Sequence, residues 1–455
     1  MFDRARRTRE LLLCLLFLLF SLTFALWFLW QSGGVLSVPV WKTVDGHRYY
    51  QLLERSLLPG LPLLILAVNG CVVGLTLWGM RRRIYLAGFA ACLGTLVLFS
   101  CTLQAFFSGY GKHLLTLAAG AGSFWAAFRL SRCRPTGTLP GTRLPLSRLL
   151  AGVILALCLL GPLFGTSVNG ARAWLRLGGL SLQPGQLLLP LLVWYAASRF
   201  PCRSLREVRP FFLLCLAAIL SLCLTNDLGG AAILVVLMLV ACWYLTDRIT
   251  LSAGLLCSFL AMFLIFLRLR GSAILSRFNC FRVFDAGDGQ QYQALYALLH
   301  HGLHGSGVGP DAPYLLSTTV TYAQNDLAAL LPVAILGLGA LFLLLLAFAG
   351  LLLGPALNPA ASPYHVVLHS GAAATLFAQA LLNLSGSLNV LPFTGVTFPL
   401  LSTGGTALLS AGALLGFCLS AIVWGTSGTE RSRVPRPNLF PFPCNPPAFL
   451  RRYLP

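Results

Sequence analysis

Apolar stretches of about 20 residues that carry almost no charge recur along this chain, and they constrain its fold more than any other feature. A helix of roughly 20 residues is long enough to cross the hydrocarbon core of a bilayer. Only 10% of the 455 residues are charged and 57% are hydrophobic, a balance far from that of an average soluble domain. The sequence therefore predicts an all-α polytopic membrane protein.

We predict about twelve transmembrane helices from these stretches. The N-terminal stretch is interpreted as an uncleaved first span, because Trp27 and Trp30 stand where a signal peptide would have small residues. Residues 1–425 are predicted to form a single transmembrane domain, followed by a Pro-rich cytoplasmic tail at 426–455. The predicted spans are 11–30, 59–79, 84–105, 113–130, 148–166, 184–199, 210–224, 229–246, 249–267, 327–353, 363–383 and 406–425.

The Lys and Arg residues indicate on which side of the membrane each loop lies. The net charge is +20, and the basic residues lie mostly at the ends of the predicted spans. Cytoplasmic loops carry an excess of Lys and Arg, so we predict that both termini are cytoplasmic and that the large loop 268–326 lies outside. Anionic membrane lipids, rather than nucleic acid, are the expected counter-charge. The basic clusters of the inner side are Arg4–Arg9, Arg81–Arg83, Arg129–Arg148, Arg199–Arg209 and Arg431–Arg452.

Residues 389–410, NVLPFTGVTFPLLSTGGTALLS, interrupt the apolar pattern. The segment is rich in Pro, Gly, Ser and Thr, yet it lies between two predicted spans. Irregular backbone at membrane depth is tolerated only where protein or a water-filled cavity covers it. We therefore interpret the segment as a re-entrant wall of a cavity on the outer face, and an ordinary exposed loop is the alternative.

Short motifs follow one another in a fixed order over residues 150–425. They are NGARAW (169–174), QPGQ (183–186), NDLG (226–229), Gln293 with the glycines up to Gly307, NDL (325–327), LPFTG (391–395) and STGGT (402–406). In this order and spacing they resemble the motifs of the SEDS family, the polytopic proteins of cell shape, cell division and sporulation that include RodA, FtsW and SpoVE. The resemblance implies a SEDS-like core of ten spans, preceded here by two more.

The resemblance also implies an activity and a partner. Members of the family are peptidoglycan glycosyltransferases, which polymerise lipid II on the outer face of the bacterial cytoplasmic membrane during cell division or elongation. They pair with a class B penicillin-binding protein, which is a transpeptidase. By this resemblance the chain is expected to be a multi-pass cell-wall enzyme whose substrate is lipid II.

Two acids of the large loop are the candidate catalytic residues. Transfer of a sugar from a lipid pyrophosphate is helped by a base close to the attacking hydroxyl, and a carboxylate can supply it. The resemblance places the family's essential Asp within RVFDAGDGQQYQ (282–293), where Asp288 and Asp285 both fit, and Asp288 is preferred because Gly289 follows it. A divalent cation, Mg²⁺ or Mn²⁺, is a candidate cofactor that would stabilise the departing pyrophosphate. HHGLHG (300–305) fits no strong metal-ligand spacing, and no residue is assigned as a metal ligand.

The motif positions supply the candidate substrate-binding residues. Arg172 suits a pyrophosphate oxygen, or it anchors the chain at the membrane interface beside Trp174. Asp227 and Asp326 each precede a span, so either could simply cap a helix. The candidates are Asn169, Arg172, Trp174, Gln183, Asp227, Gln293, Asp326, Asn383, Pro392, Thr394, Gly395, Pro399, Ser402, Gly404 and Gly405.

Four motif positions depart from the family pattern, and the first is Ala173, where the family has the second of two basic residues. Gln186 stands where the family has Glu, Leu189 where it has Lys, and Ala334 begins AILG (334–337) where the family has an acidic motif. Ionisable residues at membrane depth are usually functional, so two further hypotheses stay open: a non-catalytic scaffold of a cell-wall synthesis complex, and a flippase or transporter of a lipid-linked sugar. The retained loop acids favour the polymerase over the scaffold. A transporter should show a second, mirrored interrupted segment, which the sequence does not suggest.

Overall fold

The computed structural model describes residues 35–44, 47–56, 84–104, 110–132, 145–168, 171–178, 180–199, 205–246, 323–353, 363–388 and 394–423, with short runs or single positions among 253–268, at 305 and at 390–391. The predicted spans 11–30 and 59–79, most of 249–267, almost all of the loop 268–326 and the tail 426–455 lie outside the described residues. Five candidate site residues also lie outside them: Asn169, Asp285, Asp288, Gln293 and Pro392.

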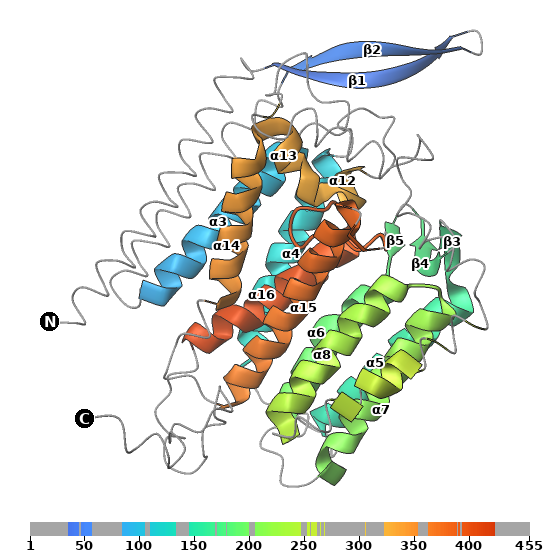
Figure 1. The fold of residues 1–455 in the computed structure, drawn as a ribbon, viewed down its shortest axis with the longest axis vertical. Helices are drawn as coiled ribbons and strands as arrows, with labels where there is room; N and C mark the ends of the chain where they lie inside the picture. Colours follow the sequence, from blue (N-terminus) through green and yellow to red (C-terminus); the bar gives the residue numbers. More distant parts are fainter. Residues whose placement is uncertain are drawn as a thin grey trace, which may run out of the picture.

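Long helices packed side by side form the body of the molecule (Figure 1). They are α3 (Ile84–Gln104), α4 (Tyr110–Leu130), α5 (Leu146–Phe164), α6 (Pro184–Ser198), α7 (Leu205–Leu224), α8 (Leu228–Thr246), α14 (Leu338–Leu353), α15 (Pro363–Ser387) and α16 (Gly405–Val423). Within the described residues, five of these helices, α5, α7, α8, α15 and α16, are long and apolar enough to cross a membrane. The prediction of an all-α polytopic membrane protein is confirmed, while the total of twelve spans stays a prediction.

Helices α4 and α16 pack with their backbones in close contact. A Cβ on Gly412 would lie 2.2 Å from the carbonyl oxygen of Gly120, and a Cβ on Gly416 would lie 2.3 Å from that of Phe124. Ser123 adds a hydrogen bond across the same contact, from its Oγ to the Leu409 carbonyl at 2.7 Å. Small residues allow membrane helices to approach this closely. Since α16 also contacts α3, α6 and α15, it connects the two sides of the bundle.

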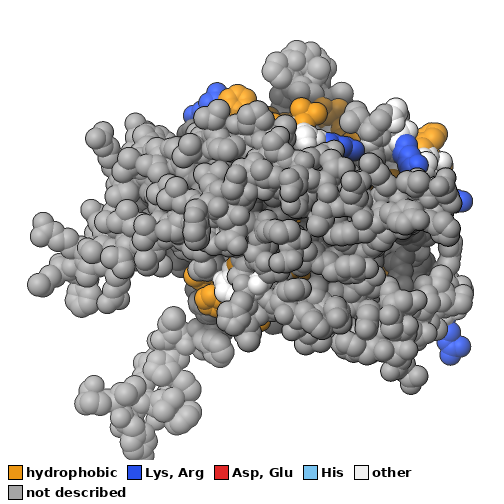
Figure 2. All heavy atoms as spheres, turned by 90° about the horizontal axis from the view of Figure 1, so that it is seen from above, with side chains coloured by type: hydrophobic (Ala, Val, Ile, Leu, Met, Phe, Trp, Pro, Cys, Tyr) orange, Lys and Arg blue, Asp and Glu red, His pale blue; other side chains and the backbone are white. Residues whose placement is uncertain are grey.

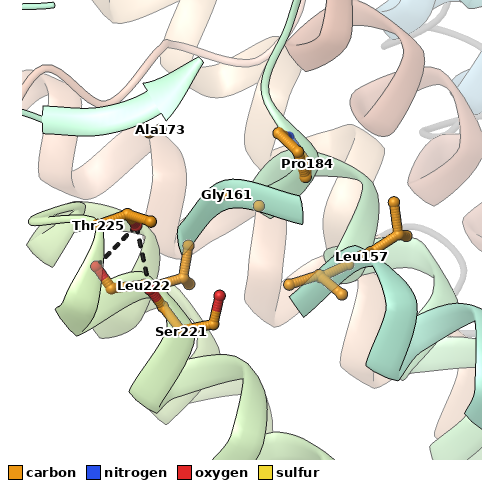
Figure 3. Close-up of a pocket in the computed structure, with 9 residues that line it drawn as sticks. Leu157, Gly161, Ala173, Pro184, Ser221, Leu222 and Thr225 are labelled. Carbon is orange, nitrogen blue, oxygen red and sulfur yellow. Dashed lines mark hydrogen bonds between the residues drawn. The ribbon is translucent and has the colours of Figure 1, made fainter. Parts of the chain in front are cut away.

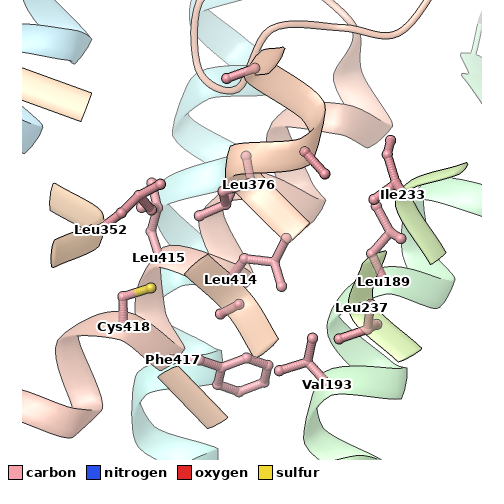
Figure 4. Packing of buried hydrophobic residues seen from close by; sticks show 14 of the residues in the cluster. Leu189, Val193, Ile233, Leu237, Leu352, Leu376, Leu414, Leu415, Phe417 and Cys418 are labelled. Atoms are coloured by element: carbon pink, nitrogen blue, oxygen red, sulfur yellow. The ribbon is translucent and has the colours of Figure 1, made fainter. Parts of the chain in front are cut away.

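Buried apolar side chains fill the interior between α6, α8, α15 and α16. Figure 4 shows Leu189 and Val193 of α6, Ile233 and Leu237 of α8, and Leu414 of α16 in this cluster. In the most apolar stretch of α16, 72% of the residues are buried, whereas in that of α5 only 22% are. The outward apolar surface of α5 is therefore the surface expected to face lipid. Seen from above, the visible Lys and Arg side chains of the described residues lie toward the edge of the molecule (Figure 2).

The predicted span 327–353 is not one continuous helix. It follows the short helix α12 (Ala323–Asp326) and consists of the 3₁₀ turn η3 (Ala328–Leu330), helix α13 (Leu331–Leu336) and α14. The break falls at Gly337, whose φ of 85° cannot continue an α-helix. The break was not predicted, because the apolar composition of the stretch conceals a single residue with a left-handed backbone, and the span itself stays a prediction.

Two small antiparallel sheets accompany the helices. The strands β1 (Val35–Val44) and β2 (His47–Ser56) form a hairpin in which Trp41 pairs with Tyr50. A second sheet, in the order β3-β4-β5, consists of β3 (Thr166–Val168), β4 (Ala171–Leu177) and β5 (Leu180–Leu182). This second sheet connects α5 to α6 and lies at the same end of the bundle as α12 (Figure 1). It contains Arg172 and Trp174, two of the candidate site residues.

Candidate functional site

The turn between α7 and α8 holds the first candidate acid. The amide of Asp227 donates to the Leu222 carbonyl at 2.8 Å and that of Asn226 to the Cys223 carbonyl at 3.1 Å, while Asn226 has a left-handed φ of 62°. This is the Schellman pattern of a helix C-terminus. The Asp227 side chain then caps α8, because its Oδ1 accepts the amide of Gly230 at 2.9 Å. The interpretation of Asp227 as a helix cap is confirmed.

Gln183 connects this turn to two further helices. Its Nε2 donates to Asp227 Oδ2 at 2.8 Å. Its backbone amide donates to Thr406 Oγ1, in the first turn of α16, at 3.1 Å. Because Gln183 immediately precedes α6, these two bonds hold the N-terminal ends of α6, α8 and α16 together.

Strand β4 lies against the same turn. The backbone amide of Arg172 donates to the Thr225 carbonyl at 2.8 Å, and the Arg172 side chain is exposed. Trp174 is half-buried, and its carbonyl accepts the Thr166 hydroxyl at 2.8 Å. The structure thus places Arg172 next to the turn of Asp227 with its guanidinium outward. Both interpretations of Arg172, as a pyrophosphate ligand and as an interface anchor, stay predictions.

The irregular segment before α16 is covered by protein. Residues 396–402 are buried, so the alternative of an ordinary exposed loop is wrong for this part. The Val396 carbonyl accepts Asn383 Nδ2 of α15 at 2.7 Å. Ser402 Oγ accepts the Phe398 amide at 2.8 Å and donates to the Asn325 carbonyl at 2.7 Å. Side chains from neighbouring elements therefore satisfy the backbone groups that the lack of secondary structure leaves open.

Helices α3 and α4 hold the tightest part of this segment. Leu400 has a φ of 66°, which is uncommon for a residue with a branched side chain. Its carbonyl accepts the Ser100 hydroxyl at 2.5 Å, and the next carbonyl, of Leu401, accepts Gln104 Nε2 at 2.6 Å. Ser100 Oγ also lies 2.9 Å from Nε2 of the buried His113. Ser100, Gln104 and His113 were not among the predicted site residues, although polar side chains within apolar helices are a signal for such contacts.

The remaining motif residues of this region are Pro399, Gly404 and Gly405. Pro399 is buried in the turn that contains Leu400. Gly404 and Gly405 lead into α16, where a Cβ on Gly405 would lie 3.1 Å from Thr116 Cγ2 of α4. Gly405 therefore allows the close approach of α16 to α4 at this end of the bundle.

The second candidate acid, Asp326, is also in contact with the irregular segment. It is the last residue of α12, so the alternative that it caps the following helix is wrong. Its carbonyl accepts Asn383 Nδ2 at 2.9 Å and the Ser387 hydroxyl at 3.2 Å. Its carboxylate faces Gly395, where a Cβ would lie 3.9 Å from Oδ2. Burial raises the pKa of Asp326 from 3.8 to about 6.

Close packing brings the two acids into one region. A Cβ on Gly229, two residues after Asp227, would lie 2.4 Å from Val396 Cγ2 and 3.1 Å from Thr394 Cβ. Thr394 in turn precedes Gly395, which faces Asp326. The N-terminus of α8 is thus in contact with the irregular segment, and the segment is in contact with α12. Within the described residues, the candidates Gln183, Asp227, Thr394, Gly395, Asp326, Asn383 and Ser402 form one connected group.

A small cavity lies beside this group (Figure 3). Its walls come from α5, β4, α6 and α7 and include Gly161, Ala173, Pro184 and Thr225. The volume of about 10 Å³ is enough for roughly one water molecule, so this cavity cannot hold a lipid-linked sugar. The predicted lipid-substrate cavity stays a prediction, because the large loop that carries Asp288 lies outside the described residues.

Residues 75–423 match the sequence model of FTSW_RODA_SPOVE, the cell cycle protein family. The chain belongs to the FtsW/RodA/SpoVE family. The resemblance to SEDS proteins in the sequence is thereby confirmed, and the chain is a multi-pass membrane protein of this family.

Two relatives and one solved structure show how far the likeness extends. The probable peptidoglycan glycosyltransferase FtsW of Coxiella burnetii is 28% identical over 321 residues, which are 68% of this chain and 84% of that protein. The probable peptidoglycan glycosyltransferase FtsW of a Synechocystis species is 29% identical over 359 residues, which are 74% and 87% of the two chains. A chain from a peptidoglycan synthase complex aligns with a TM-score of 0.52 at 24% identity, covering 79% of this chain and 96% of that one. The structural match shows the shared fold.

The positions that depart from the FtsW/RodA/SpoVE pattern are buried and uncharged. Leu189 belongs to the apolar core with 1% of its surface exposed, and Ala334 is 2% exposed. Gln186 is 5% exposed and its Oε1 accepts Nε2 of Gln379 in α15 at 3.0 Å. Gln379 was not among the predicted site residues, and its signal in the sequence is an amide side chain within a largely apolar span.

The described residues show no metal centre. No group of three His, Cys, Asp or Glu side chains among them lies close enough to hold a metal ion. A divalent cation would therefore need the phosphate oxygens of its ligand, the acids of the large loop, or both. The cation stays a prediction.

Proposed function

We propose that this protein is a peptidoglycan glycosyltransferase that polymerises lipid II on the outer face of the bacterial cytoplasmic membrane, in cell division or elongation. The observation that carries the proposal is the match to proteins named as probable peptidoglycan glycosyltransferases over 84% and 87% of their lengths. The matched family region, residues 75–423, includes every motif on which the site is built.

In the proposed reaction a sugar hydroxyl of one substrate attacks the anomeric carbon of another. The new glycosidic bond forms as the bond from that carbon to the pyrophosphate oxygen breaks, and the lipid pyrophosphate leaves. Asp288, with Asp285 as the alternative, accepts the hydroxyl proton. Arg172 and a divalent cation, Mg²⁺ or Mn²⁺, offset the negative charge of the leaving pyrophosphate.

Asp326 contributes to substrate binding in this proposal. Its pKa of about 6 means that it gains or loses a proton close to neutral pH. When protonated it can donate a hydrogen bond to a sugar or phosphate oxygen, and when ionised it can only accept one. Both carboxylate oxygens of Asp227 instead accept hydrogen bonds from the protein itself. In this proposal Asp227 therefore holds the turn between α7 and α8 in place and does not contact the substrate.

The proposed orientation places the large loop outside and both termini in the cytoplasm. In a Cys-depleted background, a single Cys at position 290 is expected to react with a membrane-impermeant thiol reagent on intact cells, and one at position 140 is not. The opposite labelling pattern would overturn the orientation, and with it an outer-face reaction.

The proposed partner is a class B penicillin-binding protein. The apolar surface that α5 exposes would allow its transmembrane segment to pack against the bundle. Co-purification from native membranes in mild detergent tests the pairing. If this protein is isolated without a partner under conditions that preserve other membrane complexes, the proposed pairing is wrong.

Polymerisation by the purified protein tests the activity itself. The protein is incubated with lipid II and Mg²⁺ or Mn²⁺, with and without the candidate transpeptidase, and glycan strands are separated on a gel. Strands longer than the substrate are expected. If no strands form with the partner present, the proposed activity is wrong.

A non-catalytic scaffold is the second candidate, because uncharged Gln186, Leu189 and Ala334 occupy positions that are charged in the family pattern. It predicts a stable complex with the transpeptidase and no glycan product. No described feature favours a flippase over these two.

A further inference from the structure

Helices α6 and α15 are joined by two buried polar bonds at opposite ends of their contact. Near the candidate site, Gln379 Nε2 donates to Gln186 Oε1 at 3.0 Å. At the far end, Trp194 Nε1 donates to Tyr364 Oη at 3.2 Å. Gln186 is 5% exposed and Gln379 is 2% exposed, and apolar side chains of the core cluster occupy the space between the two bonds.

Each glutamine lies within four residues of a side chain that holds one of the two candidate acids, Asp227 and Asp326. Three residues before Gln186, Gln183 holds the carboxylate of Asp227. Four residues after Gln379, Asn383 holds the carbonyl of Asp326. Residues three or four apart on a helix lie on the same face, so Gln379 and Asn383 face the same side of α15.

Stability alone does not explain this bond. Replacing both partners of a buried hydrogen bond by apolar groups of similar shape is close to neutral, whereas removing one partner leaves the other unsatisfied. Leu189, one turn beyond Gln186, already packs in the adjacent core with 1% exposure. Leucines at 186 and 379 would extend this apolar packing, whereas two amides must meet in one geometry.

We propose that Gln186 and Gln379 are a positioning pair that fixes α6 against α15 and so sets the separation of Asp227 and Asp326. This inference rests on the proposed function and adds to it two residues that act through their neighbours. Because both side chains are uncharged, the bond is not weakened by salt or by a change of protonation in the way an ion pair would be.

The test compares Gln186→Leu, Gln379→Leu and the double variant with wild type in lipid II polymerisation and in thermal unfolding. Each single variant is expected to unfold at a lower temperature, because one buried amide loses its partner. The double variant is expected to recover the unfolding temperature while kcat stays roughly 10- to 100-fold below wild type and KM changes little. Recovery of kcat together with stability would show a purely structural bond and overturn the proposal.

Trp194→Phe is the matched control, because it removes the other buried bond between the same two helices. It is expected to lower the unfolding temperature and to leave kcat within about twofold of wild type, since it acts at the end away from the site. If Trp194→Phe lowers kcat as much as the double leucine variant, any loosening of α6 against α15 has the same effect, and the specific role of the glutamines is wrong.

Hydrogen exchange provides a readout that does not need activity. Backbone amides of 225–231 and 394–402 are expected to exchange faster in the double leucine variant than in wild type, and at the wild-type rate in Trp194→Phe. Unchanged exchange in both segments would overturn the positioning role. A wild type that makes no glycan would instead overturn the proposed function, and the exchange experiment would still decide whether the pair positions the two halves.

Discussion

The tripeptide Asn-Asp-Leu occurs twice at the candidate site, at 226–228 and at 325–327, and the two copies adopt different structures. In the first, Asn226 has a left-handed φ and the Asp227 carboxylate accepts bonds from Gly230 and Gln183. In the second, Asp326 ends α12, and none of the described residues donates a hydrogen bond to its carboxylate. The same local sequence thus gives one acid that holds the structure and one whose carboxylate accepts no hydrogen bond from the described residues.

The difference arises from the neighbours of each copy. At 226–228 the preceding helix ends in a Schellman motif, which places the Asp where it can begin the next helix. At 325–327 the irregular segment binds Asn325 instead, through Ser402 at the carbonyl and Thr403 at the side-chain oxygen. These two bonds involve residues 77 and 78 positions away, so they cannot follow from the tripeptide itself.

The largest expected effect comes from acids outside both copies. If Asp227 is structural and Asp326 binds substrate, the catalytic base is in the large loop, and we expect Asp285→Asn/Asp288→Asn to lower the rate of lipid II polymerisation by roughly 10²–10⁴-fold. Asp288→Asn alone should account for most of the loss. Rates are compared at matched protein amounts, with unfolding temperatures as the control for folding. Wild-type activity in the double variant would remove both loop acids from the mechanism and turn attention to Asp326.

The raised pKa of Asp326 predicts a pH-dependent stability. Its pKa is higher in the folded protein, about 6, than the ordinary value of 3.8, so the folded state binds this proton more tightly than the unfolded state. Its contribution is therefore fully present below about pH 4 and is lost as the pH rises through 6. Between pH 4 and pH 7 wild type should lose on the order of 2 kcal/mol relative to Asp326→Asn. Thermal unfolding at a series of pH values measures this, and parallel curves for the two proteins would contradict it.

Loss of the cap at the first copy is expected to cost less. Asp227→Ala removes the acceptor of both the Gly230 amide and Gln183 Nε2, and we expect it to lower the free energy of unfolding by about 1–2 kcal/mol. Asp227→Asn keeps an acceptor for the Gly230 amide and serves as the control, with a smaller loss. The free energies come from denaturation in detergent. Equal losses for Ala and Asn would mean that the charge, and not the cap, is what matters.

The two asparagines give the smallest and sharpest contrast. Asn226→Gly leaves the backbone of the turn unstrained, because glycine readily adopts a φ of 62°, so any loss in the free energy of unfolding comes from the Asn226 side chain. Asn325→Gly should lower it by about 1 kcal/mol, since the side-chain oxygen accepts the Thr403 hydroxyl at 2.6 Å. Equal effects of the two substitutions would show that the copies are less different than their contacts indicate.

Most residues of the candidate site could be predicted from the sequence motifs, but the contacts between them could not. The cap at Asp227 follows from a short polar side chain directly before an apolar helix, which is a local pattern. The buried position of 396–402 follows from the need to cover irregular backbone within a membrane. The Gln186–Gln379 bond spans 193 positions, and neither glutamine carries a local signal that names its partner.

The class of the protein and most of the long helices among the described residues could be predicted from the amino-acid sequence alone. Spans predicted at 184–199 and 229–246 correspond to α6 (Pro184–Ser198) and α8 (Leu228–Thr246), because about 20 charge-free residues have one stable conformation across a bilayer. Three features could be known only from the three-dimensional arrangement: the break of 327–353 at Gly337, the contact of Asp326 with Gly395, and the side chains that bind the irregular segment. Those features depend on contacts between residues far apart in the chain, and apolar composition carries no information about them.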